Sequence, residues 1–166
     1  QIGGKAVLRW TDKQSTDGPM GPIQSKTERD SRNMLVFDLE DSARVILRPS
    51  GTEPKAKIYV ETMSIAETLQ EVVGLQKQME IDSNRLGNAF CIDMLNRVGI
   101  ALPEWAMEIS DLVSIENKLN WSTKLVPQLL QEIQQDPENA FQWLHEQLNP
   151  SNRALLLPGI KAFLAT

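Results

Sequence analysis

The sequence is poor in the residues that usually carry redox or metal chemistry. It contains one cysteine, Cys91, and one histidine, His145, among its 166 residues. A single cysteine excludes an intrachain disulfide and favours a reducing, cytoplasmic setting. Because no partner ligands stand at helical spacing around His145, we expect no metal site within this chain.

Long apolar runs and an excess of positive charge are also missing. No stretch approaches the roughly 20 apolar residues of a membrane span, and no signal peptide is visible. The net charge of -5 argues against a general nucleic-acid binder or a binder of anionic membranes. The acidic excess lies in residues 63–166, whereas residues 1–62 are close to neutral. We therefore expect neither nucleic acid nor membrane among the partners.

The pattern of apolar residues changes near residue 63. Residues 5–10, 34–40, 43–48 and 57–62 are short apolar or alternating runs, which predict about four strands. The segment between the first two runs, residues 11–33, is polar and contains several glycines and prolines. It predicts a mobile excursion rather than a buried connection.

From residue 64 onward the spacing is that of helices. Ser64 and Glu67 match a capping box and predict a helix start. An apolar face follows at intervals of three and four residues: Ile65, Leu69, Val72, Leu75 and Met79. A second helix is predicted over residues 83–99, with an inward face of Leu86, Phe90, Met94 and Val98.

Further helices are predicted in the rest of the chain. One covers residues 114–135 and is kinked or restarted near Pro127. Asp136 and Pro137 form a helix start with a cap and a first-turn proline. The inward residues of that helix are predicted to be Ala140, Phe141, Leu144 and Leu148, and one or two short turns close the chain.

Together these patterns predict an α+β fold for the first part of the chain. It comprises a small antiparallel sheet of about four strands backed by helices, over residues 1–82. An all-helical extension of unknown role follows over residues 83–166.

The octapeptide RPSGTEPK, residues 48–55, is the stretch whose composition points to chemistry. The planar cation of Arg48 matches two oxygens of a phosphate or carboxylate. Ser50 and Thr52 each offer a hydroxyl, and Gly51 permits a positive φ that would turn backbone N–H groups toward one anion. Pro49 and Pro54 stiffen both sides. Donors from several directions suit the tetrahedral phosphate better than a carboxylate.

A purely structural interpretation of this loop also stays open. A Ser-Gly-Thr turn between strands is common, and an arginine at a strand end is often solvated, so the loop could be an ordinary turn that binds no ligand. Glu53 would repel an anion, so it is expected to orient Arg48 or to pair with another basic group. Lys55 and Lys57 could add positive potential, although lysines in such strands are more often solvated. The loop does not match the nucleotide-binding pattern GxxxxGK[ST].

The segment DLEDSARVILRPSGTEPKAKIYVE, residues 38–61, closely resembles the signature of the α-D-phosphohexomutase superfamily, and most of all its phosphomannomutase/phosphoglucomutase branch. GKAVLRWTD, residues 4–12, resembles the first strand of the same domain. The resemblance covers roughly residues 1–80. It implies the fourth, C-terminal domain of such an enzyme, with a fold related to the TATA-binding protein.

This resemblance implies that Arg48, Pro49, Ser50, Gly51 and Thr52 form a loop that binds the substrate phosphate. It also implies an isomerase that interconverts hexose 1- and 6-phosphates through a bisphosphate, with the loop holding the phosphate that is not reacting. The family's phosphoserine loop, aspartate-rich magnesium loop and sugar-reading loop are absent from this chain.

We therefore expect a C-terminal fragment without catalytic residues of its own, inactive alone. The Mg²⁺ site would lie in the missing N-terminal domains, which would be partners together with a phosphorylated hexose. The sequence does not determine whether mannose, glucose, glucosamine or a pentose is preferred. The alternative hypothesis is a non-catalytic protein-interaction module that uses the helical extension.

Overall fold

The computed structural model describes residues 1–53, 55–148 and 150–165. It divides into two compact units, residues 1–91 and residues 92–166. The division falls inside one long helix, α2 (Leu69–Arg97). The change of periodicity in the sequence therefore comes well before the division between the units.

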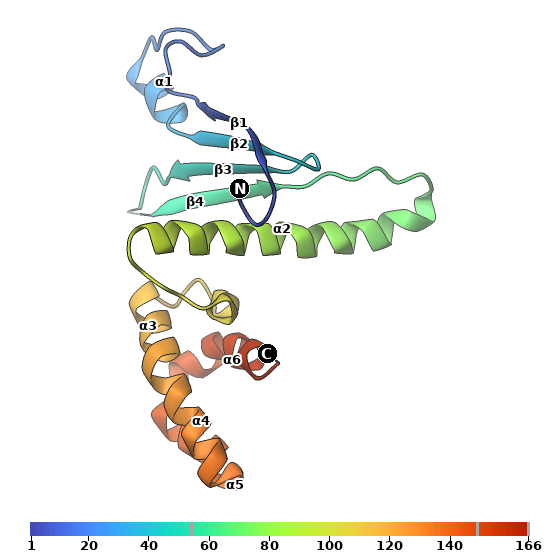
Figure 1. Cartoon of the computed structure of the whole chain (residues 1–166). Helices are drawn as coiled ribbons and strands as arrows, with labels where there is room; N and C mark the ends of the chain where they lie inside the picture. Colours follow the sequence, from blue (N-terminus) through green and yellow to red (C-terminus); the bar gives the residue numbers. More distant parts are fainter. Residues whose placement is uncertain (54, 149, 166) are drawn as a thin grey trace. The chain divides into compact units, whose positions relative to one another are not determined.

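The first unit contains a four-stranded antiparallel sheet in the order β1-β2-β3-β4 (Figure 1). The strands are β1 (Val7–Asp12), β2 (Leu35–Leu39), β3 (Arg44–Pro49) and β4 (Ala56–Glu61). Each pairs with its neighbour in sequence; the β2–β3 and β3–β4 connections are short, whereas residues 13–34 connect β1 to β2. The predicted α+β fold with about four antiparallel strands is confirmed.

The tight turn between β2 and β3 sets the register of the central hairpin. Asp41 and Ser42 both take positive φ, 57° and 55°, which is the conformation of a two-residue turn that matches the twist of the flanking strands. The backbone N–H of Leu39 donates to the carbonyl oxygen of Ala43 at 2.8 Å. This register places Phe37 opposite Val45 and Asp38 opposite Arg44.

Helix α2 covers one face of the sheet (Figure 1). Val45 and Leu39 are 0% and 2% exposed, and Leu86 and Phe90 of the helix are each 3% exposed. The rings of Phe37 and Phe90 lie 5.8 Å apart between their centroids. Burial of these apolar side chains holds the helix on the sheet.

The predicted start and faces of α2 are only partly right. The helix begins at Leu69 rather than near Ser64, and Ile65 and Leu69 are 86% and 91% exposed. Leu86 and Phe90 face inward as predicted, but Met94 and Val98 are exposed. The two predicted helices are one helix of 29 residues, which extends beyond the short strands that cover its middle.

The polar segment before β2 is better anchored than a mobile excursion would be. It contains α1 (Lys26–Ser31), whose first turn is capped by the Ser25 hydroxyl. Arg32 follows and is 5% exposed. Its guanidinium donates to the carbonyl oxygens of Gly21 and Met20 at 2.7 and 2.9 Å and pairs with Glu28. A buried cation with several acceptors thus ties part of the segment to itself, whereas its mobility stays a prediction.

The second unit is helical in its described part. After the end of α2 come η1 (Glu104–Glu108), α3 (Ile115–Asn120), the π-helical turn η2 (Trp121–Leu125), α4 (Val126–Gln135), α5 (Pro137–Gln147) and α6 (Pro150–Leu164). Pro127 is the second residue of α4, which follows the π turn. The π turn immediately before α4 confirms the predicted irregularity near Pro127, and a proline is tolerated in the first turn of the helix that follows. The side chain of Asp136 caps α5 as predicted.

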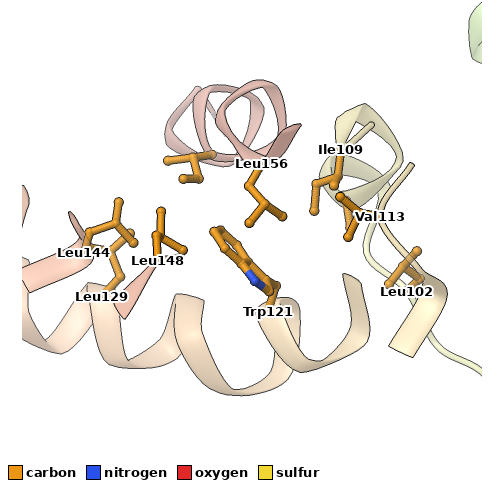
Figure 2. Close-up of a cluster of buried hydrophobic side chains, with 10 residues drawn as sticks. Leu102, Ile109, Val113, Trp121, Leu129, Leu144, Leu148 and Leu156 are labelled. Carbon is orange, nitrogen blue, oxygen red and sulfur yellow. The ribbon is translucent and has the colours of Figure 1, made fainter. Parts of the chain in front are cut away.

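The core of the second unit is built around Trp121, which is 8% exposed. Figure 2 shows its ring pointing toward Leu156, with Leu144 and Leu148 to one side. Ala140, Leu144 and Leu148 are buried as predicted, but Phe141 is 63% exposed. The closing segment forms one helix, α6, that continues through Pro158, because burial of Leu156 and Ile160 on either side offsets the missing backbone bond.

Candidate functional site

The loop with the phosphate-like donor set joins β3 to β4 at one end of the sheet. Arg48 pairs with Lys57 and Pro49 pairs with Ala56, which are the last two pairs of the two strands. The Ser50 N–H donates to the carbonyl oxygen of Lys55 at 2.8 Å, and the Lys55 N–H donates to that of Glu53 at 2.8 Å. These two bonds close the base of the loop and leave its tip open.

The donors at the tip are available for a ligand. Gly51 and Thr52 are exposed, and their N–H groups donate to no other described residue. The Ser50 hydroxyl is buried and has no hydrogen-bond partner in the described part of the chain. A buried polar atom without a partner is uncommon in a native protein and calls for an explanation.

Arg48 is half-buried on β3. Within the described ranges it has no acidic side chain at ion-pair distance. Gly51 does not adopt the positive φ expected from the sequence, so in this structure the loop is not a preformed nest of N–H groups. The expectation that Pro54 stiffens the loop concerns a residue outside the described ranges.

Glu53, the one acid of the octapeptide, is neutralised locally. Its carboxylate accepts a hydrogen bond from the Lys55 ammonium, with the two atoms 2.6 Å apart. This bond, together with the charges of Lys55 and Lys57, lowers the pKa of Glu53 below its ordinary value. Of the two expected roles for Glu53, pairing with another basic group is confirmed. Its charge therefore opposes an anion at the loop only weakly.

The opposite end of the sheet carries a second charged cluster, formed by Arg9, Asp38, Arg44 and Glu61. Asp38 accepts from Arg44 at 2.7 Å and from Arg9 at 2.7 and 2.9 Å, and these bonds lower its pKa. Arg44 also donates to Glu61 at 3.2 Å. A hollow of about 360 Å³ lies beside this cluster. Because its cations and carboxylates satisfy one another, it offers a charged ligand less than the loop does.

The described residues do not fit a magnesium site. They contain no group of three or more histidine, cysteine, aspartate or glutamate side chains placed to hold a metal ion.

Among the described residues, no helix combines the length and apolarity needed to cross a membrane.

The C-terminal domain of the phosphoglucomutase/phosphomannomutase family matches residues 13–75 of the chain. The matched region contains β2, β3, β4 and the loop Arg48–Thr52. Residues 13–75 are therefore similar to a phosphohexomutase C-terminal domain, in agreement with the sequence resemblance.

A curated relative agrees with this assignment. The chain is 58% identical over 36 residues to a protein from Haemophilus influenzae named "Probable phosphomannomutase". The aligned stretch covers 22% of this chain and 7% of the relative, so the chain spans a small part of that protein. No solved structure matches the chain at a comparable level of significance.

The structure brings the predicted loop residues together in one bend between adjacent strands. The sequence left open whether Lys57 adds positive potential at the loop or is a solvated strand lysine, and it did not place Lys57 opposite Arg48. The signal was present, because a hairpin register that pairs Val45 with Val60 also pairs Arg48 with Lys57. That pairing shapes the electrostatics of the site.

Proposed function

We propose that this chain is the C-terminal part of a phosphohexomutase and that its β3–β4 loop binds the phosphate of a phosphorylated hexose. One observation carries the proposal. Arg48, the Ser50 hydroxyl and the N–H groups of Gly51 and Thr52 lie in or beside one bend, and none donates a hydrogen bond to a described acceptor. Hydrogen-bond donors without a protein acceptor favour an anion-binding site over a solvated turn or a protein-docking surface.

In the intact enzyme, the loop would hold the phosphate that is not reacting, while a phosphoserine in another domain exchanges its phosphoryl group with the sugar. The loop has no acid or base placed for proton transfer, since Glu53 is paired with Lys55. Its contribution would be positioning and charge stabilisation, which are the main protein contributions to phosphoryl transfer. The Mg²⁺ that the family resemblance implies would be bound by residues of other domains.

The proposal is tested by titrating the ¹⁵N-labelled chain with glucose 6-phosphate and mannose 1-phosphate while following its amide signals. The signals of Ser50, Gly51 and Thr52 should shift, and the same sugars without phosphate should have no effect. Because the chain would hold only one part of a divided site, binding should be weak, with a Kd of roughly 1–10 mM. An absence of shifts up to roughly 50 mM ligand would contradict the proposal.

Arg48→Ala provides the matched variant. It removes a fork of charge-assisted hydrogen bonds worth about 1.5–3 kcal/mol, so the affinity for either sugar phosphate should fall at least tenfold. Arg44→Ala is the control, because it removes an arginine from the same face of the same strand whose charge is already paired with Asp38 and Glu61. Equal losses in the two variants would show that the loop has no special affinity for phosphate.

A further inference from the structure

Arg48 and Lys57 are two like charges placed directly opposite each other on β3 and β4. Opposed residues of an antiparallel pair project from the same face of the sheet, and like charges in this arrangement are destabilising. Neither side chain has an acidic partner at ion-pair distance within the described ranges. This pair thus raises the energy of the domain in the absence of a bound anion.

The other arginine of β3 shows that the face can neutralise its charges. Arg44 stands opposite Glu61 on β4 and opposite Asp38 on β2, and it bonds to both carboxylates. Four residues further along the same strand, Arg48 instead meets Lys57 on β4. The uncompensated positive charge is therefore confined to the end of the sheet where the loop lies.

The remaining charged groups at this end do not cancel the pair. On the loop, the carboxylate of Glu53 is held by Lys55 at 2.6 Å. Asp12 ends β1, and its carboxylate accepts a hydrogen bond from the Gln14 N–H at 2.9 Å but forms no ion pair with Arg48 or Lys57 in the described ranges. Lys13, the next residue, adds a further positive charge. The charge of Lys57 contributes to the lowered pKa of Glu53, so Lys57 acts within electrostatic reach of the loop. Helix α2 packs on the opposite face.

We infer that Lys57 is the second cation of the phosphate subsite and that, with Arg48, it selects the dianionic form of the phosphate. This inference rests on the proposed function. A phosphate monoester carries one negative charge below its second pKa, about 6, and two above it. Arg48 alone balances the monoanion, whereas Arg48 and Lys57 together balance the dianion. The lysine supplies a point charge, and the arginine supplies the fork that fixes geometry.

Two sugar esters of equal shape separate charge selection from general attraction. Glucose 6-sulfate stays a monoanion throughout the accessible pH range, while glucose 6-phosphate becomes a dianion above about pH 6. At pH 7.5 the unmodified chain should bind the phosphate about tenfold more tightly than the sulfate, which corresponds to about one added charge interaction. At pH 5 this preference should disappear.

Lys57→Gln should remove most of the preference at pH 7.5. The affinity for the phosphate should fall about five- to tenfold, and the affinity for the sulfate should change less than twofold. Lys57→Arg should keep the preference because it keeps the charge. Lys77→Gln, on the exposed surface of α2, is the control for a change in net charge and should leave both affinities unaltered.

The outcomes distinguish a failure of this inference about Lys57 from a failure of the proposed function. If Arg48→Ala abolishes phosphate binding but Lys57→Gln leaves the preference intact, the phosphate site stands and the role of Lys57 is refuted. Equal weakening of both esters by Lys57→Gln also refutes selection, because it reveals only long-range attraction. If the unmodified chain binds neither ester, the proposed function fails and this inference fails with it.

Discussion

Gly159 of α6 lies against the side chain of Ile109, which is 1% exposed at the centre of the helical unit. A β-carbon at position 159 would overlap Cγ1 of Ile109 and would lie 3.1 Å from its Cδ1. The helix can approach this closely only because residue 159 has no side chain. Gly159 is thus a packing residue, not a flexible point in the helix.

Gly159→Ala should destabilise the helical unit. Forcing Ile109 out of a closely packed core costs about 1–3 kcal/mol, which exceeds the gain of up to about 1 kcal/mol from replacing glycine by alanine in a helix. Urea denaturation followed by helical circular dichroism measures the change. Gly74→Ala is the matched control, because a β-carbon there has no neighbour within 4 Å and the substitution should stabilise. A gain in both variants would contradict the contact.

Leu86 and Leu69 stand on the same helix but in opposite environments, 3% and 91% exposed. Leu86→Ala should lower the free energy of unfolding by about 2–4 kcal/mol, since it leaves a cavity against the sheet. Leu69→Ala should change it by less than about 0.5 kcal/mol. Thermal or urea unfolding of the two variants checks this. Similar costs would mean that the start of α2 is covered in solution.

Asp38 should make stability depend on pH in the acid range. Its pKa is lowered by hydrogen bonds from Arg44 and Arg9, so its contribution is complete above its ordinary pKa of 3.8 and is lost as the pH falls through the lowered value. Asp38→Asn should cost about 1 kcal/mol at pH 7, a modest figure because both arginines are exposed. The gap between the variant and the unmodified chain should narrow as the pH falls below 3.8 and should close once Asp38 is protonated in the folded chain. A gap that persists there would rule out the carboxylate charge as its cause.

Lys57→Glu should stabilise the domain in the absence of ligand. It converts a repulsive cross-strand pair with Arg48 into an attractive one, a change of about 0.2–1 kcal/mol, and phosphate binding should be lost at the same time. Melting temperatures with and without glucose 6-phosphate measure both effects. Lys77→Glu is the control for net charge. A lower melting temperature for Lys57→Glu alone would show that Lys57 stabilises the ligand-free domain.

Local signals in the sequence predicted much of this architecture. Alternation placed the four strands, Asp136 and Pro137 marked the start of α5, and the composition of residues 48–52 singled out the loop. These features depend on neighbours along the chain, so the sequence reveals them directly. The resemblance of residues 38–61 then supplied the family, which the match over residues 13–75 supports.

Features that depend on the size of a packing partner were predicted less well. An amphipathic pattern marks the face of α2 that is suited to burial, but not how far the covering surface extends. A helix of 29 residues is roughly 44 Å long, about twice the length of a six-residue strand. The sheet therefore covers Leu86 and Phe90, while Ile65, Leu69 and Val73 stay exposed.

The charges of the site were predictable one residue at a time but not as a set. Arg48 was recognised because of its neighbours in sequence, whereas Lys57 matters because of its partner across the hairpin. Likewise, the burial of Arg32 depends on carbonyl groups of Met20 and Gly21, more than ten residues earlier. Pairings of this kind appear only once the register and the turns are known.

The long helix that crosses from one unit into the other limits where the chain can be shortened. A fragment ending at residue 82, where the sequence pattern suggests a boundary, would lack Leu86 and Phe90, which cover the apolar face of the sheet. Leu39 and Val45 would then be exposed to solvent, and such a fragment should aggregate rather than fold. An expression fragment of the unit that contains the sheet should therefore retain the chain at least through Cys91.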